Sequence, residues 1–179
     1  MSDFDSLDVV STPRMRGERL VEAHFPHLLA LYRDPKVMAT LGGVQTEAQI
    51  RVGFDANLAH WDKHGYGLWA FFDLDDGSFM GRGGLRSLMQ DGVNEFEIAY
   101  AVPANKWGKG IATEIAALSA KVAFEQLGLG NVVAFTLPDN VASRKVMEKL
   151  HMTYERDIIH ADMPHVLYRL TEEAYRSGG

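Results

Sequence analysis

Apolar side chains recur at helical spacing in two stretches of the N-terminal third of the chain. The first stripe predicts a helix over residues 21–32, which the following Asp-Pro pair ends. The second predicts a helix that begins at Thr46, a candidate N-cap with Gln49 three residues later, and that continues through Trp61. Two glycines then end this helical pattern.

Alternating apolar and polar positions predict strands before and after these helices. Residues 9–20 predict one short strand, which Pro13 confines to a sheet edge or a strand start. Residues 67–74, 78–88 and 94–102 predict three more strands, separated by two turns that are rich in Asp and Gly. Such short connections are typical of an antiparallel meander.

The C-terminal half alternates between helices and strands. A helix follows the glycines of residues 105–110 and stops at residues 127–130. Beyond it, the pattern predicts a strand over 131–137, a helix over 141–150, and strands over 152–159 and 165–170.

This order predicts an α+β (mixed α/β) fold with a central mixed, mostly antiparallel twisted sheet of six to seven strands and about four flanking helices. We expect a single domain over residues 1–179, with residues 1–8 as a flexible tail.

Composition narrows the function classes. An apolar content of 46% without a long apolar run excludes a membrane span, and an acidic N-terminus without a basic and apolar leader predicts a cytoplasmic protein. Because there is no cysteine, disulfides, thiolate metal clusters and a cysteine nucleophile are excluded. The net charge of −6 argues against direct nucleic-acid binding and is compatible with a cationic amine substrate.

Histidine spacing raises one metal hypothesis. His60 and His64 are four residues apart, a spacing that places two ligands on one helix face. No third ligand is evident, so we expect no metal and interpret the pair as a solvated helix face.

The segment WGKGIA, residues 107–112, puts two glycines directly ahead of a predicted helix. Glycine is a poor helix former, so Gly108 and Gly110 require a reason to be there. One reason is an anion such as phosphate that approaches the free N–H groups of the first turn. The other is a tight turn between a strand and a helix, and this segment alone does not separate the two.

Two longer segments carry a family resemblance: EIAYAVPANKWGKGIATE, residues 97–114, and LPDNVASRKVMEKLHMTYER, residues 137–156. Together with weaker N-terminal similarity in TPRMRGERL and YRDPKVM, they resemble the GNAT acetyltransferase superfamily. The resemblance is greatest to the branch that includes ribosomal-protein N-terminal alanine acetyltransferases. The resemblance covers about residues 9–170 and implies acetyl-CoA as co-substrate, without a metal.

The resemblance also implies which residues contact acetyl-CoA. Backbone amides of residues 108–113 would receive the pyrophosphate at the helix N-terminus. A strand that splays from its neighbour at a bulge would offer its free edge to the pantetheine arm. The cofactor contacts expected on this basis are Ala101, Val102, Gly108, Lys109, Gly110, Ile111, Ala112, Thr113, Asn140 and Ser143.

Glu97 and Ser143 are the catalytic residues that the resemblance implies. Glu97 would act as general base toward the amine, directly or through a water, and Ser143 would lie near the sulfur. Glu95 shares the face of Glu97 by strand alternation and is the main competitor as base. Asn140 and Ser143 are equally suited to cap the helix that follows them.

Three further positions concern the branch's pattern. Ala99 stands where the branch usually has glycine, a difference that bears on the geometry of the expected bulge. Tyr154 is a weaker candidate acid, because the branch usually has a core aromatic residue there. His151 replaces a glycine after the helix, so we expect a left-handed histidine.

The acceptor is expected in a groove between the first two helices and the neighbouring strands, with Phe54, Trp61, Trp69 and Arg82 as candidate contacts. Protein N-termini, polyamines and aminoglycosides all satisfy the description of a cationic amine. A phosphate-binding loop of the Walker type is excluded, because Lys109 is followed by Gly110 rather than by Ser or Thr. A non-catalytic acyl-CoA-binding module is the alternative to an enzyme, and a monomer or a homodimer is expected.

Overall fold

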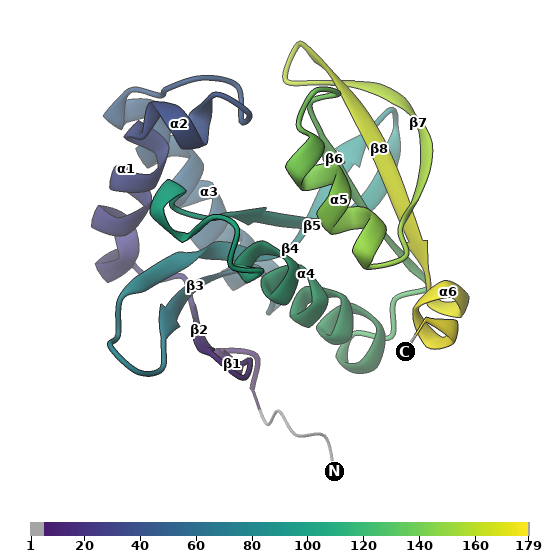
Figure 1. Ribbon diagram of the computed structural model, residues 1–179, viewed down its shortest axis with the longest axis horizontal. Helices are drawn as coiled ribbons and strands as arrows, with labels where there is room; N and C mark the ends of the chain where they lie inside the picture. The colour runs from purple at the N-terminus through teal and green to yellow at the C-terminus, as the bar shows by residue number, and fades with distance from the viewer. Residues whose placement is uncertain (1–5, 179) are drawn as a thin grey trace.

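The computed structural model describes residues 6–178, which fold around one eight-stranded sheet of strand order β1-β2-β3-β4-β5-β6-β8-β7 (Figure 1). Neighbouring strands are antiparallel except β5 and β6, which run parallel. The strands are β1 (Val9–Ser11), β2 (Met15–Arg19), β3 (Leu68–Asp73), β4 (Phe79–Gln90), β5 (Val93–Ala101), β6 (Asn131–Thr136), β7 (Thr153–His160) and β8 (Met163–Thr171).

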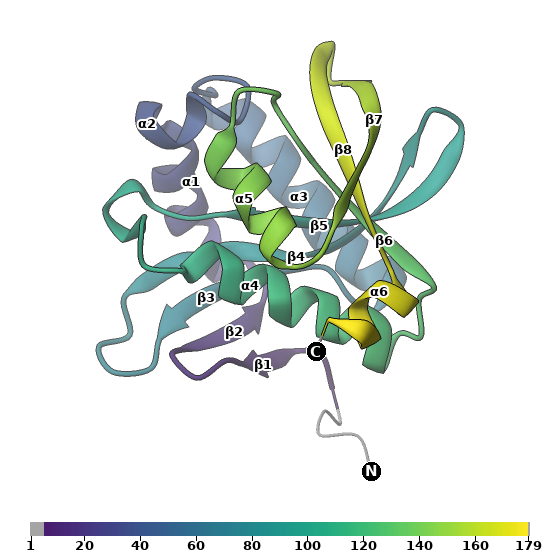
Figure 2. The ribbon, with the colours of Figure 1, turned by 45° about the vertical axis from the view of Figure 1, so that its right-hand side comes forward.

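Helices cover both faces of this sheet (Figures 1 and 2). They are α1 (Phe25–Arg33), α2 (Pro35–Met38), α3 (Glu47–His64), α4 (Ile111–Lys121), α5 (Val141–Lys149) and α6 (Glu172–Ser177). A π-helical turn, Val122–Gln126, continues α4. On β4, Arg82 reaches Tyr32 of α1, while the next residue, Gly83, faces Ile115 of α4. Alternation along β4 therefore separates an α1 face from an α4 face.

The parallel pair β5 and β6 separates toward the C-terminal end of both strands. Their ladder contains a single pair, Glu97 with Val133, whereas β5 pairs with β4 along its whole length. The expected splay of β5 from its neighbour is therefore present. The expected bulge is not seen in the β4–β5 ladder, whose register runs without a shift from Arg82–Ala101 to Gln90–Val93.

The mixed α/β class of the fold is confirmed, with corrections in the element count. Residues 9–20 form two strands rather than one, because Pro13 lies in the turn between β1 and β2. The sheet of the described residues thus has eight strands instead of six to seven. The short helices α2 and α6 were not predicted, since fewer than eight residues give no clear periodicity.

The predicted tail falls partly outside the described residues, which begin at Ser6. Residues 6–8 lie against the sheet: the carbonyl oxygen of Leu7 accepts a 2.8 Å hydrogen bond from Nε1 of Trp69, and that of Asp8 accepts one from the Arg19 amide. These contacts attach residues 7 and 8 of the predicted tail to β3 and β2.

Candidate active site

The glycine loop ends in a helix start that leaves amides free. Gly108 and Gly110 both adopt left-handed backbone conformations, with φ of 72° and 76°. Gly110 is the N-cap of α4 and provides no side chain to bond the first turn. The Glu114 amide bonds to the Gly110 carbonyl, so the amides of residues 111–113 come before the first backbone bond of the helix. The loop therefore exposes donors of the kind that bind anions.

Arg14, in the turn between β1 and β2, holds this loop in place. Its Nη1 donates to the Lys109 carbonyl oxygen at 2.9 Å, and its Nε donates to Oε2 of Glu114 at 2.8 Å. The hydrogen bonds and charge of Arg14 help to lower the pKa of Glu114, although burial opposes them. One guanidinium thus joins the residue before the N-cap to the first turn of α4.

A cleft of about 500 Å³ opens beside this loop, between α4, α5 and the end of β5. We call it the cofactor cleft. Among the residues expected to contact acetyl-CoA, those that line it are Ala101, Val102, Gly108, Gly110, Ile111, Ala112, Thr113, Asn140 and Ser143. Lys109 is not among the lining residues, and its carbonyl oxygen faces Arg14 instead.

On the opposite wall of the cofactor cleft, Asn140 caps α5 and Ser143 meets β5. Oδ1 of Asn140 accepts from the Ser143 amide at 3.1 Å, which leaves the Asn140 amide nitrogen available. The Ser143 hydroxyl lies 2.8 Å from the hydroxyl of Tyr100, which also lines the cleft. Burial raises the pKa of Tyr100 to about 12, so this phenol stays protonated at neutral pH.

Three lysines of the cofactor cleft were missed by the sequence analysis. Lys106 precedes the glycine loop, and Lys145 and Lys149 lie one turn apart on α5. The sequence did contain a signal for two of them, since these lysines are four residues apart on the helix that follows the PDN segment. Such pairs usually mark a solvated helix face, however. Their side chains add positive charge to a cleft that already offers free amides.

Glu97 lies on the α1 face of β5 and is buried. Its Oε2 accepts from Nε and Nη2 of Arg86, the residue opposite on β4, at 3.0 and 2.6 Å. The charge of Glu97 raises the pKa of the Arg86 guanidinium. Within residues 6–178, Oε1 of Glu97 has no hydrogen bond and is not among the fully buried unsatisfied atoms, so one carboxylate oxygen stays available.

Glu95, the competing base, is fully engaged. Arg169 of β8 donates to both of its oxygens, at 3.0 Å to Oε2 and 2.7 Å to Oε1. The Arg169 guanidinium, held also by Glu155, has a raised pKa because these carboxylates favour its charged form. Both oxygens of Glu95 are engaged, whereas Oε1 of Glu97 is free within residues 6–178, so the geometry favours Glu97 over Glu95 as the base.

Three of the four residues expected to line the acceptor groove lie in the core instead. Trp61 and Trp69 are fully buried, and their indole nitrogens donate to the backbone of Leu68 and Leu7. Phe54 is 3% exposed and packs edge-on against Phe25. These three are therefore core residues. The sequence analysis assigned them to the groove because periodicity alone does not distinguish a core stripe from a groove wall.

Arg82 alone among those candidates keeps unused polar atoms. It is 8% exposed, and its Nε donates to the Tyr32 hydroxyl at 2.7 Å. Its Nη1 is buried with no hydrogen-bond partner among the described residues. Such an atom is unusual, since buried donors are almost always satisfied.

The remaining positions of the predicted site have structural roles. Tyr154 is 52% exposed, and its hydroxyl donates to Asp157 on the same strand. His151 has a φ of 62°, so the predicted left-handed histidine is confirmed. Tyr154 does not line the cofactor cleft, which leaves Tyr100 as the phenol beside Ser143.

The two histidines of α3 do not form a metal site. Nε2 of His60 accepts from the Ser87 amide at 2.9 Å and therefore carries no proton. Nδ1 donates to the Tyr66 carbonyl oxygen at 2.9 Å. Both ring nitrogens of His60 are therefore occupied. Among residues 6–178, no group of three potential ligands is suitably placed for a metal ion.

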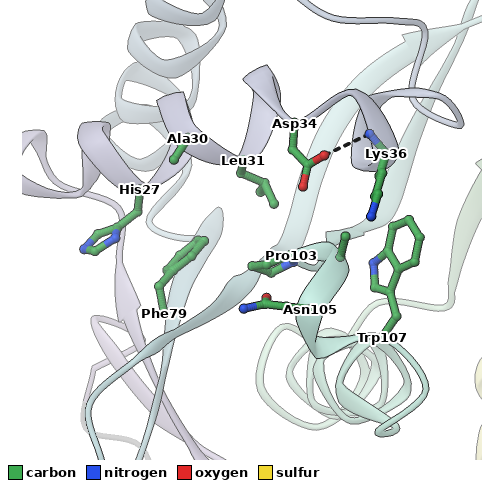
Figure 3. A pocket seen from close by; sticks show the side chains of 10 residues that line it. His27, Ala30, Leu31, Asp34, Lys36, Phe79, Pro103, Asn105 and Trp107 are labelled. Atoms are coloured by element: carbon green, nitrogen blue, oxygen red, sulfur yellow. Dashed lines mark hydrogen bonds between the residues drawn. The ribbon is translucent and has the colours of Figure 1, made fainter.

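A second cavity, of about 730 Å³, lies on the other side of the segment 103–107 (Figure 3). His27 stands at one end of it beside Phe79, and Trp107 stands at the other. Asp34 turns its carboxylate back to the Lys36 amide at 2.8 Å as the cap of α2. None of the expected cofactor contacts lines this cavity, which shares only Trp107 with the cofactor cleft.

Comparison with known proteins identifies the family. The family model described as "Acetyltransferase (GNAT) domain" matches residues 14–153, so the chain belongs to the GNAT acetyltransferase family. The predicted class of enzyme, an N-acetyltransferase, is thereby confirmed. An uncharacterized Bacillus subtilis protein, YkkB, is 30% identical over 138 residues, which are 77% of this chain and 80% of that protein.

Solved structures share the fold. An acetyltransferase from Agrobacterium tumefaciens has a TM-score of 0.83 and 23% identity, with 96% of this chain and 99% of that one covered. RimL, a ribosomal L7/L12 α-N-protein acetyltransferase solved with coenzyme A, has a TM-score of 0.75 and 17% identity, with 93% of this chain and 99% of that one covered.

None of the helices in residues 6–178 combines the length and the apolar character that crossing a membrane requires.

Proposed function

We propose that the protein transfers an acetyl group from acetyl-CoA directly to a primary amine, on a protein N-terminus or a small molecule. The observation that carries this proposal is the pairing of a left-handed glycine loop with free amides at the start of α4, beside a cleft of about 500 Å³. In a chain of the GNAT family, this combination suits a nucleotide-bearing thioester.

The cofactor cleft fits acetyl-CoA in its donors and its shape. The amides of residues 111–113 and the side chains of Lys145 and Lys149 are suited to the phosphates. The free amide nitrogen of Asn140 and the edge of β5 at Ala101 and Val102 are suited to the amides of the pantetheine arm. When bound, acetyl-CoA supplies an acetyl group activated as a thioester.

Glu97 serves as the general base in this proposal. Arg86 fixes Oε2 and leaves Oε1 to accept the proton of the incoming amine, directly or through a water. The two hydrogen bonds from the guanidinium also fix the orientation of the Glu97 carboxylate. The ion pair therefore orients the base more than it strengthens it.

Ser143 and Tyr100 act at the sulfur of CoA, whereas Glu97 acts at the amine. Their 2.8 Å hydrogen bond aligns two hydroxyl groups on the wall of the cofactor cleft, where the sulfur is expected. With a pKa of about 12, Tyr100 holds its proton and donates it as a hydrogen bond. The lack of cysteine supports direct transfer over a cysteine acyl-enzyme, and a serine acyl-enzyme is the alternative route.

The wider setting belongs to the same proposal. We propose a single domain over residues 1–179 that acts in the cytoplasm as a monomer or a homodimer. The single sheet around which residues 6–178 fold supports the single domain.

The Arg86–Glu97 ion pair is also what favours the alternative, an acyl-CoA-binding module without turnover, because the pair gives Glu97 a structural role that requires no proton transfer. Calorimetry with acetyl-CoA and a thiol-release assay against N-terminal peptides, polyamines, aminoglycosides and amino acids separate the two. The enzyme requires that Glu97→Gln reduce the transfer rate by about 100-fold or more and leave acetyl-CoA affinity unchanged. Binding by the wild type without release on any amine would instead support the module.

A further inference from the structure

Arg82 carries a buried positive charge that the protein leaves without a counterion. The residue is 8% exposed, and its single hydrogen bond goes from Nε to the neutral hydroxyl of Tyr32. Nη1 has no partner, and no carboxylate of residues 6–178 forms an ion pair with this guanidinium.

The neighbouring charges do not compensate for Arg82. Arg86 lies four positions further along β4, on the same face, and shares that face with Glu97. Glu97 already neutralises Arg86, and Glu95 already neutralises Arg169. The α1 face of β4 and β5 thus holds one excess positive charge, in a chain whose net charge is −6.

The position of Arg82 connects this excess charge with the proposed reaction. Its strand partner is Ala101, which lines the cofactor cleft, and Glu97 lies four residues from Ala101 on the same face of β5. Four residues of a strand span about 13 Å. The side chains of Arg82 and Glu97 therefore project from the same side of the sheet.

We propose that Arg82, oriented by Tyr32, binds a carboxylate of the acceptor, so that the acceptor is a small amine that also carries a carboxylate, such as an amino acid. This inference rests on the proposed acetyl transfer and narrows its acceptor. A carboxylate provides two oxygens for the fork of a guanidinium, which matches the unused Nη1 better than a neutral amide does. The same positive charge lowers the pKa of a nearby ammonium group and so increases the neutral amine that can react.

The test uses pairs of acceptors that differ only in the carboxylate: common L-amino acids and their carboxamides, in the thiol-release assay. Wild-type protein is expected to favour the acid over the amide of its preferred pair. Arg82→Met should lower kcat/KM for the acid by between about 10-fold and 100-fold and narrow the gap to the amide, with Arg82→Lys in between. The affinity for acetyl-CoA, measured by calorimetry, should not change.

A thermal readout keeps the inference testable without any acceptor. Removing an unpaired buried charge relieves its desolvation cost, so Arg82→Met should melt at a higher temperature than the wild type. Arg176→Met, on exposed α6, is the control and should leave activity unchanged. A lower melting temperature with unchanged acceptor choice would show that Arg82 is structural.

Two other results would overturn the inference. Equal loss of rate on acids and amides in Arg82→Met would place Arg82 at the acetyl group instead of the acceptor. Wild-type preference for amides, polyamines or peptides would remove the carboxylate from the substrate. Absence of acetyl-CoA binding would instead contradict the proposed function itself, so the two failures remain distinct.

Discussion

The hydroxyl of Tyr100 on β5 lies 2.8 Å from the hydroxyl of Ser143 on α5, in the wall of the cofactor cleft. Because the Tyr100 hydroxyl is one of this hydrogen-bonded pair, Tyr100→Phe should lower kcat by between about tenfold and 100-fold. The fold should persist, since the ring packing is kept. Stopped-flow or steady-state thiol release measures the effect, and Tyr154→Phe, at an exposed position, is the matched control. Equal rates for both variants would remove Tyr100 from the mechanism.

Arg14 preorganises the glycine loop in this account. Arg14→Met removes its bonds to Lys109 and Glu114, so the loop must be ordered when the ligand binds. The dissociation constant for acetyl-CoA should rise about fivefold to tenfold, with little change in kcat at saturation. Arg16→Met, two residues away on β2, is the control. An unchanged dissociation constant would show that Arg14 stabilises the fold and does not contribute to acetyl-CoA binding.

Lys145 and Lys149 should contribute charge to acetyl-CoA binding. Replacing both by alanine should weaken binding about tenfold at low ionic strength, and added salt should shrink this difference because solvent-exposed charges are screened. The double variant Lys63→Ala/Lys121→Ala makes the same change in net charge outside the cofactor cleft and should bind normally. A salt-independent loss, or an equal loss in the control, would contradict a direct phosphate contact.

His60 makes stability depend on pH. Burial lowers its pKa below 6.5, and its Nε2 must stay unprotonated to accept from the Ser87 amide. Between 6.5 and the lower folded value, the unfolded state binds more protons than the folded one. The stability from neutral His60 is therefore full above pH 6.5 and is lost as the pH falls through its folded pKa.

Urea unfolding at a series of pH values measures this effect. His60→Gln should flatten the decrease below pH 6.5, although His24 and His160, whose pKa values burial also lowers, keep part of it. His64→Gln is the neighbouring control on α3. A pH profile of His60→Gln that matches the wild type would contradict the role of this ring.

Local features of the fold could be predicted from the sequence because their causes lie within a few residues. The predicted cap of α3 is present as a capping box between Thr46 and Gln49. The left-handed position of His151 likewise follows from a short motif. In each case, one turn of backbone contains all the groups that determine the structure.

Other features depend on tertiary contacts that no local pattern records. The sequence placed Glu95 and Glu97 on one face, but only the order of the strands in the sheet shows that Arg169 of β8 engages both oxygens of Glu95 and that Arg86 of β4 engages one oxygen of Glu97. The aromatic positions Trp61 and Trp69 could belong to a core or a groove until the packing of α3 on β3 was known. The role of Arg14 depends on a contact across 100 residues of sequence.

The most direct test of the central claim is calorimetric titration of the wild type and of Gly110→Ala with acetyl-CoA. Gly92→Ala is the control, because Gly92 has a similar φ of 78° and lies in the hairpin between β4 and β5; an added methyl group would meet no atom within 4 Å there and would be 3.6 Å from Nη2 of Arg14 at Gly110. The account predicts one-to-one binding by the wild type and the control, and binding at least about tenfold weaker in Gly110→Ala, since both backbone strain and the added methyl group oppose the ligand. No binding by folded wild-type protein, or equal binding by all three, would contradict an acetyl-CoA site at the start of α4.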